Sequence, residues 1–204
     1  MMKPAFVLGN GKSRLAFDLN TFKTHGRVFG CNALYRDFTP HVLVATDSGI
    51  GEEIENSGYP LRNEFYTRNP RIEFGSKKIE DHWGFSSGPV AIKLAAKRGH
   101  TVIYLIGFDL ASTNGLQNNV YSGSPNYKPA DDQQTYYGNW VNQITTIMKE
   151  HPNQIFVRVI PEEGVVPFQW LQVPNYRTQS DNVFRVDINN KPWQKPKELA
   201  THIL

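Results

Sequence analysis

The sequence predicts an α/β fold, a Rossmann-like three-layer sandwich in which a mostly parallel sheet lies between helices. Two observations support this prediction. Several short runs, such as residues 102–106 (VIYLI), are apolar at every position, which is typical of strands covered on both faces of a parallel sheet. Segments with helical spacing separate these runs, which favours repeated strand–helix–strand units.

The central unit is a helix followed by a buried strand. The helix is expected over residues 88–98, where the apolar side chains fall on one face. Ser86 or Ser87 can cap the free N–H groups at its start. The strand of residues 102–106 follows, and Asp109 lies just past its carboxyl end. Ligands bind at this edge of open α/β sheets, so Asp109 is a candidate site residue.

The remaining elements form one domain with a C-terminal extension. Strands are expected at Ala5–Leu8, Arg27–Cys31, 42–46, Ile155–Ile160 and 183–188, and helices at 48–57 and 136–150. The length of 204 residues fits a single core, so we expect a nucleotide-binding domain over residues 1–160. Prolines interrupt the pattern over residues 161–204, which are expected to pack on the domain or on a partner subunit of a homo-oligomer.

The composition restricts the classes of partner. With 22 Lys and Arg against 19 Asp and Glu, the net charge of +3 is too balanced to indicate nucleic acid, but it suits an anionic small molecule. The single cysteine, Cys31, excludes an internal disulfide and suits a reducing compartment. No signal peptide is visible, and no apolar run approaches the length of about 20 residues that a membrane span needs. We therefore expect a cytoplasmic protein without a transmembrane segment.

A glycine-rich turn, Gly9-Asn10-Gly11, follows the first expected strand. A turn between a strand and a helix points backbone N–H groups at an anion. Neither of the two familiar phosphate-binding motifs matches, however. A P-loop requires glycine at the position of Phe6, and the dinucleotide fingerprint requires glycine or alanine at the position of Arg14. The turn is therefore either an anion site of another class or a plain tight turn.

Small polar residues end the expected strands. Asn10, Asn32, Asp47 and Asp109 each follow an apolar run. The carboxyl ends of parallel strands meet at one edge of a sheet, so these side chains should lie on the same edge. Short amides and carboxylates can bind ribose hydroxyls and phosphates without filling a cleft, which predicts a nucleotide site there.

Residues 111–135 form a long loop after the central strand, rich in Ser, Asn, Gly and Pro. Long loops in compact domains are usually functional lids or disordered segments. We expect a lid that is mobile when the site is empty and ordered over a bound nucleotide. The loop carries Tyr121 and Tyr127, whose side chains can close on a phosphate or stack on a base.

Four motifs in this order resemble the bacterial sialyltransferases of glycosyltransferase family 42. They are GNG at residues 9–11, CNA at 31–33, SSG at 86–88 and IYLIGFD at 103–109. The same motifs are similar to the related group described as 6-hydroxymethylpterin pyrophosphokinase-like. The resemblance covers residues 6–121 and implies a Rossmann-like fold that binds a nucleotide.

The resemblance also implies roles for single residues. Asn10 and Asn32 would contact the phosphate and ribose of a CMP-type donor, and Asp47 would face the ribose. Ser87 and Gly88 would hold the pyrimidine edge through backbone and hydroxyl groups. The nucleotide-binding set that follows is Gly9, Asn10, Gly11, Asn32, Asp47, Ser86, Ser87 and Gly88.

Tyr121 and Asp109 are the candidate catalytic residues. Tyr121 falls where the related enzymes have a lid tyrosine that donates to the leaving phosphate, a task that a metal performs in other glycosyltransferases. Such enzymes need no metal or cofactor besides the nucleotide-sugar donor. The sequence shows no His, Cys or carboxylate cluster with the spacing of metal ligands.

The sequence departs from the sialyltransferases in the half of the site that activates the acceptor. Gly84 stands where they have an arginine, and Ala111 stands where they have a tyrosine. They carry a histidine in the lid as general base, whereas no histidine lies between His100 and His151. An acidic pair at residues 131–132 is an alternative base. The identity of the transferred sugar therefore stays open.

Three functional hypotheses follow. The first is a metal-independent glycosyltransferase that uses a nucleotide-activated sugar such as a CMP-sugar. The second is a pyrophosphokinase-like transferase that uses ATP and magnesium, for which Asp47 and Asp109 are the carboxylates near the strand ends. The third is a non-catalytic nucleotide-binding protein on the same fold, which the missing histidine favours. The fold by itself does not decide among them.

Overall fold

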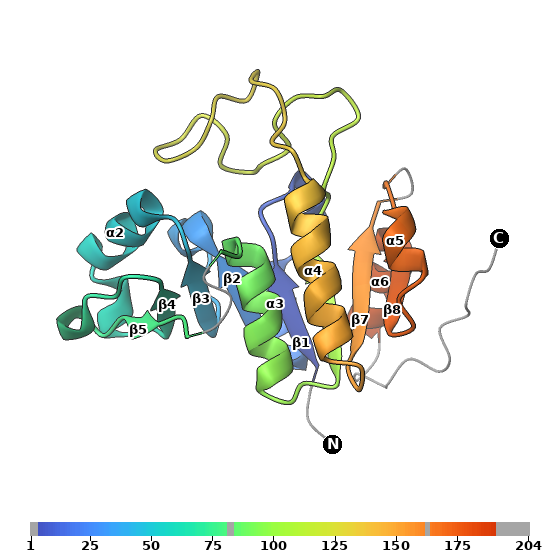
Figure 1. The fold of residues 1–204 in the computed structure, drawn as a ribbon, viewed down its shortest axis with the longest axis horizontal. Coiled ribbons are helices and arrows are strands. Elements are labelled where there is room, and N and C mark those ends of the chain that lie inside the picture. The colour runs from blue at the N-terminus through green and yellow to red at the C-terminus, as the bar shows by residue number, and fades with distance from the viewer. Residues whose placement is uncertain (1–3, 81–83, 162–163, 191–204) are drawn as a thin grey trace.

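The computed structural model describes residues 4–80, 84–161 and 164–190. Its centre is a sheet of eight described strands in the order β5-β4-β3-β2-β1-β6-β7-β8, and every neighbouring pair is parallel. Helices cover both faces of the sheet, with α3 and α4 in front of it in Figure 1. The predicted α/β, Rossmann-like fold class is confirmed.

The strands are β1 (Ala5–Leu8), β2 (Arg27–Cys31), β3 (Val42–Ala45), β4 (Phe65–Thr67), β5 (Lys77–Lys78), β6 (Val102–Ile106), β7 (Ile155–Ile160) and β8 (Tyr176–Ser180). The α-helices are α1 (Leu19–His25), α2 (Ser48–Asn56), α3 (Ser87–Lys97), α4 (Gly138–Glu150), α5 (Phe168–Leu171) and α6 (Asp181–Asn190). Short 3-10 helices are η1 (Lys12–Ala16), η2 (Asn32–Arg36), η3 (Tyr59–Leu61) and η4 (Ile72–Phe74).

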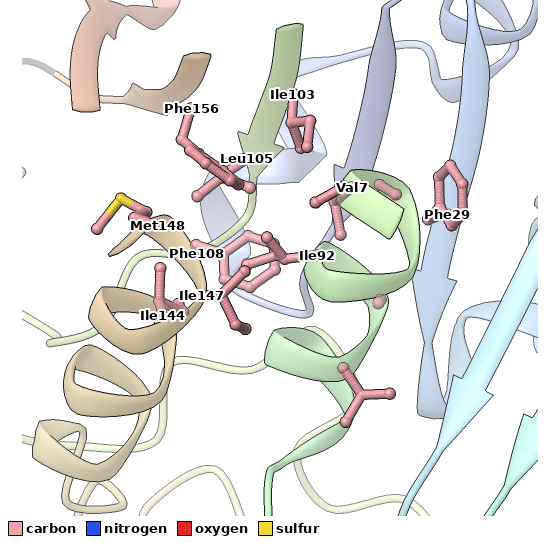
Figure 2. Packing of buried hydrophobic residues seen from close by; sticks show 14 of the residues in the cluster. Val7, Phe29, Ile92, Ile103, Leu105, Phe108, Ile144, Ile147, Met148 and Phe156 are labelled. Carbon is pink, nitrogen blue, oxygen red and sulfur yellow. The ribbon is translucent and has the colours of Figure 1, made fainter. Parts of the chain in front are cut away.

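The core lies on both faces of the sheet, which explains the uninterrupted apolar runs. Successive side chains of a strand point to opposite faces. In β1, Val7 therefore packs on the α3 and α4 side, while Phe6 and Leu8 pack on the side of α1 and α6. Figure 2 shows the first side, where residues of the sheet meet Ile92 of α3 and Ile147 of α4.

The order of the strands brings β1 and β6 together at the centre. The chain builds β1 to β5 outward in one direction, and then crosses back so that β6 lies on the other side of β1. Because all described strands are parallel, the predicted polar ends at Asn10, Asn32, Asp47 and Asp109 lie on one edge, as expected. The long connection from β6 to α4 lies above this edge in Figure 1.

The glycine turn fits tightly against the end of β6. The Gly9 N–H donates to the carbonyl of Ile106 at 2.8 Å, and the Gly11 N–H donates to the carbonyl of Gly107 at 2.8 Å. A Cβ atom on Gly9 would collide with the Gly107 carbonyl oxygen. The first glycine of the turn is therefore needed for close approach of two backbones, independently of any ligand.

The C-terminal part differs from the expectation. The strand expected at residues 183–188 is wrong, because these residues belong to helix α6. Phe184 and Ile188 are both buried, and their spacing of four places them on one helical face. The sheet also continues past residue 160 into β8, which pairs with β7 along five residues. Residues 191–204 of the expected extension lie outside the described residues.

Strand β8 was not predicted because its sequence, YRTQS, is mostly polar. An edge strand needs cover on fewer sides than a central one, so its composition carries little signal. Across the described part of the chain, no helix combines the length and the apolar character that crossing a membrane demands.

The Gly9→Ala variant tests the close approach of β1 and β6. We expect it to lower the free energy of unfolding by roughly 1–3 kcal/mol, because the methyl group meets rigid backbone. Urea unfolding measures this change. Gly84→Ala is the matched control, since a Cβ atom there meets nothing within 4 Å. Equal stability of Gly9→Ala and the parent protein would show that the turn can relax.

Candidate functional site

Asp109 occupies the anion position that the glycine turn creates. The Ser13 N–H donates to Asp109 Oδ2 at 3.0 Å, and the Ser13 hydroxyl donates to Asp109 Oδ1. A Cβ atom on Gly11 would lie 2.5 Å from Asp109 Oδ2, so the carboxylate rests directly on the turn. The start of η1 is thus capped by a carboxylate of the same chain. A catalytic role for Asp109 stays a prediction.

The guanidinium of Arg14 connects the turn to the rest of the site. Its side chain is 1 % exposed. Nη1 donates to the Gly9 carbonyl at 3.2 Å and to Asn10 Oδ1 at 2.9 Å, and Nη2 donates to the Tyr121 hydroxyl at 2.7 Å. Asp37 Oδ2 lies 3.6 Å from Nη2 and balances the charge. Arg14 fixes the orientation of the Asn10 amide, because its Nη1 can only bond to the amide oxygen.

Tyr121 is held by this ion pair. Its hydroxyl accepts from Arg14 and donates to Asp37 Oδ1 at 2.5 Å. The guanidinium carbon of Arg14 lies 5.0 Å from the centre of the tyrosine ring. Burial raises the pKa of the Tyr121 hydroxyl well above its usual value, so the group keeps its proton. The predicted catalytic role of Tyr121 requires its hydroxyl to exchange Asp37 for a ligand.

Tyr127 lies between the ends of the first two strands. Its hydroxyl accepts from the Ala33 N–H at 3.1 Å and from Asn10 Nδ2 at 3.5 Å. Both donors point at the tyrosine hydroxyl, which therefore occupies the Asn10 amide nitrogen. The predicted contact of Asn10 with a ligand stays a prediction. Sequence reasoning noted Tyr127 as a lid tyrosine but not as a site residue. The sequence signal that could have indicated Tyr127 as a site residue was its place six residues after Tyr121 in the same loop.

Asn32 combines a strained backbone with an unpaired polar atom. Its φ of 52° lies in the left-handed region, which few residues other than glycine adopt. Its Oδ1 atom is buried, and no donor in the described ranges of the chain bonds to it. A buried acceptor without a partner costs about 1–3 kcal/mol, and strained left-handed residues cluster at functional sites. The Asn32 amide is therefore open to a ligand donor.

The loop segment 121–127, here called the lid segment, is fastened from outside by an ion pair. Glu53 accepts from Arg36 Nη2 at 2.7 Å and from Asn126 Nδ2 at 2.7 Å. Arg36 also donates to the Ser124 hydroxyl at 2.8 Å and to the Pro125 carbonyl at 3.0 Å. We call this group the Arg36–Glu53 latch. It holds the lid segment in place, with the Tyr127 hydroxyl on Asn10 and on the Ala33 N–H.

The pKa of Glu53 reflects the latch. Burial alone would raise it, but hydrogen bonds from Tyr35 and Arg36, together with the charge of Arg36, lower it below its usual value of 4.5. The latch therefore contributes stability above that usual value. The contribution is lost as the pH falls through the lower pKa of the folded state.

The SSG motif serves the packing of α3. The Ser87 hydroxyl accepts from the Thr46 N–H at 2.9 Å, and the Ser86 hydroxyl accepts from the Trp140 indole at 3.2 Å. A Cβ atom on Gly88 would lie 3.0 Å from the ring of Phe108. These contacts join α3 to the end of β3, to α4 and to the loop after β6. Within the described residues, no hydrogen bond joins this motif to Asn10 or Asn32. Its predicted role at a pyrimidine stays a prediction.

The two remaining candidate carboxylates lie in different cavities. Asp47 is exposed and lines an open cavity of about 410 Å³ with Ser48 and Arg68. Asp109 lines another cavity of about 760 Å³ with Lys12. Of the predicted residues, Asn10 bonds to Tyr127 of the lid segment, and its Nδ2 also donates to the carbonyl of Cys31, the neighbour of Asn32, at 3.5 Å. Gly9 and Gly11 pack against the end of β6 instead. No group of three or more His, Cys, Asp or Glu side chains within the described ranges is arranged to hold a metal ion.

The Tyr121→Phe variant tests the buried bond set of Arg14. Loss of the hydroxyl leaves Arg14 Nη2 and Asp37 Oδ1 short of a partner, so we expect the free energy of unfolding to fall by about 1–3 kcal/mol. Tyr136→Phe is the control, because Tyr136 is 74 % exposed and should change stability little. Urea unfolding of both variants decides the matter. A similar fall in both variants would show that the bonds of the Tyr121 hydroxyl to Arg14 and Asp37 add no measurable stability.

The Glu53→Gln variant tests the latch. Removal of the charge weakens the bonds from Arg36 and Asn126, so amide hydrogen exchange across the lid segment should become faster. Glu52→Gln is the control, since Glu52 is exposed. The difference between the parent and Glu53→Gln should shrink as the pH falls through the lowered pKa of Glu53 in the folded state, because the parent then loses the same charge. Unchanged exchange in Glu53→Gln at neutral pH contradicts the latch.

Comparison with known proteins gives a structural likeness but no sequence family. No family model matches the sequence, and a sequence search of curated proteins gives no match either. The fold is similar to the crystal structure of the monofunctional alpha-2,3-sialyltransferase Cst-I from Campylobacter jejuni, with a TM-score of 0.55 and 12% sequence identity. The match covers 80% of this chain and 78% of the other. At this identity the likeness shows a shared, sialyltransferase-like fold, which agrees with the resemblance of the motifs.

Proposed function

We propose that this chain is a metal-independent glycosyltransferase that binds a nucleotide-activated sugar, such as a CMP-sugar, under the lid segment. The observation that carries the proposal is the unpaired, buried Oδ1 of Asn32 in a left-handed residue at the edge where ligands bind. Strain and an unpaired polar atom persist where a bound ligand repays them. The sialyltransferase-like fold supports a nucleotide-sugar donor.

The donor and acceptor groups suit a nucleotide. The Ala33 N–H and Asn10 Nδ2 are both donors, and they now share the Tyr127 hydroxyl. A phosphate oxygen can accept from both when Tyr127 moves aside. The Asn32 oxygen needs a donor, which a ribose hydroxyl supplies. Phosphate and ribose are thus the two halves of one ligand that would satisfy these groups together.

The chemistry follows from this placement. An acceptor hydroxyl attacks the anomeric carbon of the sugar, the bond from that carbon to the phosphate oxygen breaks, and the nucleotide leaves with the bonding electrons. The proton of the acceptor passes to a base, for which the predicted pair at residues 131–132 is the candidate. Tyr121 would donate to the leaving phosphate, where charge develops. Arg14, which contacts Tyr121, adds a positive charge behind that hydroxyl.

One observation favours a non-catalytic nucleotide-binding protein as the second candidate. The Tyr121 hydroxyl already bonds to Arg14 and Asp37, so the residue has a structural task without any substrate. The ATP- and magnesium-dependent hypothesis has less support, because Asp47 and Asp109 line separate cavities.

Nucleotide titration with the Asn32→Gly variant tests the proposed site. Glycine accepts the left-handed backbone and removes the unpaired oxygen, so the free variant should be no less stable than the parent. Binding of CMP should nevertheless weaken by about 1–3 kcal/mol, because the ribose loses its acceptor. Isothermal titration calorimetry with CMP, UDP, CMP-sialic acid and ATP, with and without EDTA, measures the binding, and urea unfolding measures the stability of the free variant.

The outcomes separate the hypotheses. CMP affinity that is unaffected by EDTA and weakened in Asn32→Gly supports the proposed site. Affinity for ATP that depends on magnesium favours the pyrophosphokinase-like alternative. Equal CMP affinity of the variant and the parent removes Asn32 from the site. Tight binding of CMP-sialic acid without turnover, in the presence of acceptor sugars, favours the non-catalytic alternative.

A further inference from the structure

We propose that Asn114 is a site of spontaneous deamidation, a reaction that converts its side-chain amide into a carboxylate. Asparagine followed by glycine is the pair most prone to this reaction, because glycine has no side chain to hinder its backbone nitrogen. The chain contains this pair twice, at Asn10-Gly11 and at Asn114-Gly115. The fold protects the first pair and leaves the second open, so only one of two identical sequences should react.

The reaction has two steps, each of which forms one bond and breaks another. The backbone nitrogen of Gly115 loses its proton to a base and attacks Cγ of Asn114. The C–N bond of the side-chain amide then breaks, and its nitrogen takes up a proton and leaves as ammonia. Water opens the resulting succinimide ring at one of its two carbonyl carbons. The products are aspartate and isoaspartate, whose main chain runs through the former side chain.

The surroundings of Asn114-Gly115 are open to a base and to water. Asn114 is exposed, and no acceptor in the described ranges of the chain bonds to the Gly115 N–H. A Cβ atom on Gly115 would meet nothing within 4 Å. Asn114 also lines the open cavity of about 760 Å³ beside Asp109, through which water reaches the pair. The nitrogen can therefore lose its proton without first breaking a bond of the fold.

The Leu116 N–H favours attack at the Asn114 amide. It donates to Asn114 Oδ1 at 3.1 Å. Negative charge collects on this oxygen when the glycine nitrogen attacks Cγ, and a donor that is already in place stabilises that charge. The leaving nitrogen, Nδ2, is bonded to no acceptor among the described residues, so nothing there opposes its departure.

The other pair, Asn10-Gly11, is closed to the same attack. The Gly11 N–H donates to the Gly107 carbonyl at 2.8 Å, which keeps its nitrogen from a base. Asn10 is 9% exposed; its Oδ1 accepts from Arg14 Nη1 at 2.9 Å, and its Nδ2 donates to the Cys31 carbonyl at 3.5 Å. Rotation of the amide toward the Gly11 nitrogen would break these buried bonds. The two pairs thus differ in structure and not in sequence.

Conversion of Asn114 would loosen the loop that follows β6. Residues 115–117 pair with residues 132–134 in this long connection, which lies above the edge of the sheet in Figure 1. The Gly115 carbonyl accepts from the Gln134 N–H at 2.9 Å. Isoaspartate inserts a methylene group into the main chain directly before this pairing. We therefore expect faster amide exchange across both segments in the modified protein.

Ageing of the full chain tests the proposal. The protein is incubated at neutral and at mildly alkaline pH, and its peptides are analysed by mass spectrometry, since deamidation raises the mass of a peptide by about 1 Da. In the folded protein, the peptide with Asn114 should convert faster than the peptide with Asn10 by about tenfold or more. In urea, where the fold no longer protects Asn10, the two rates should converge. The rate at Asn114 should rise with pH, because a base removes the glycine proton.

Asn114→Gln is the matched variant, because its longer side chain would have to close a larger ring, which forms more slowly. This variant should stay unmodified over the period in which the parent converts. Asn139→Gln is the control, since Asn139 is exposed and precedes the bulky Trp140. The rate at Asn114 should be unchanged in this control. Hydrogen exchange across residues 115–117 and 132–134 should become faster with age in the parent and in Asn139→Gln, but not in Asn114→Gln.

The opposite results would overturn the inference. The deamidation site is lost if Asn114 does not convert in the folded protein, or if Asn10 converts equally fast there. A rate at Asn10 that stays low in urea would show that the sequence, and not the fold, protects it. Conversion at Asn114 with unchanged hydrogen exchange would remove the effect on the loop. The reaction needs neither a nucleotide nor a sugar, so CMP titration of fresh protein tests the proposed function independently.

Discussion

The buried guanidinium of Arg14 is the interaction on which the candidate site depends. A buried charge is stable only when it is paired and fully hydrogen-bonded, so its neighbours must adopt one arrangement. Here the neighbours are the Gly9 carbonyl, the Asn10 amide, the Tyr121 hydroxyl and the Asp37 carboxylate. The glycine turn, the end of β1 and the lid loop are therefore oriented by one side chain. The site is organised by a protein cation, whereas many phosphate sites are organised by backbone N–H groups alone.

Most of the fold could be predicted from the sequence, because central parallel strands are buried on both faces and leave long apolar runs. The same logic placed Asn10, Asn32, Asp47 and Asp109 on one edge. Strand β8 was missed and part of helix α6 was assigned as a strand, since elements at the edge of a fold carry weaker sequence patterns. Within the site, the sequence suggested which residues end the strands. It could not show which of them bond to one another, because those contacts join segments about a hundred residues apart, such as Arg14 and Tyr121.

The position of Arg14 explains why the glycine turn does not match the dinucleotide fingerprint. Arginine at that place rules out the dinucleotide fingerprint, which needs a small residue for close helix–strand packing. The structure shows that this arginine is buried and donates to the Gly9 carbonyl, the Asn10 amide and the Tyr121 hydroxyl. In addition, Asp109 caps η1, where a dinucleotide-binding protein would place the pyrophosphate. The N–H group of Ser13 is thus taken by a carboxylate of the same chain, and the buried acceptor without a partner lies one strand further along, at Asn32.

The hydroxyl of Tyr127 has a consequence for any affinity measured at this site. It occupies the two donors that a phosphate would use, so ligand and side chain compete for one position within the same molecule. The observed dissociation constant then equals the intrinsic one divided by the fraction of molecules in which Tyr127 has withdrawn. If that fraction were about one in a hundred, a nanomolar site would appear as a sub-micromolar one, a loss of about 2.7 kcal/mol. Weak binding by this chain would thus report the stability of its closed state as much as the quality of its contacts.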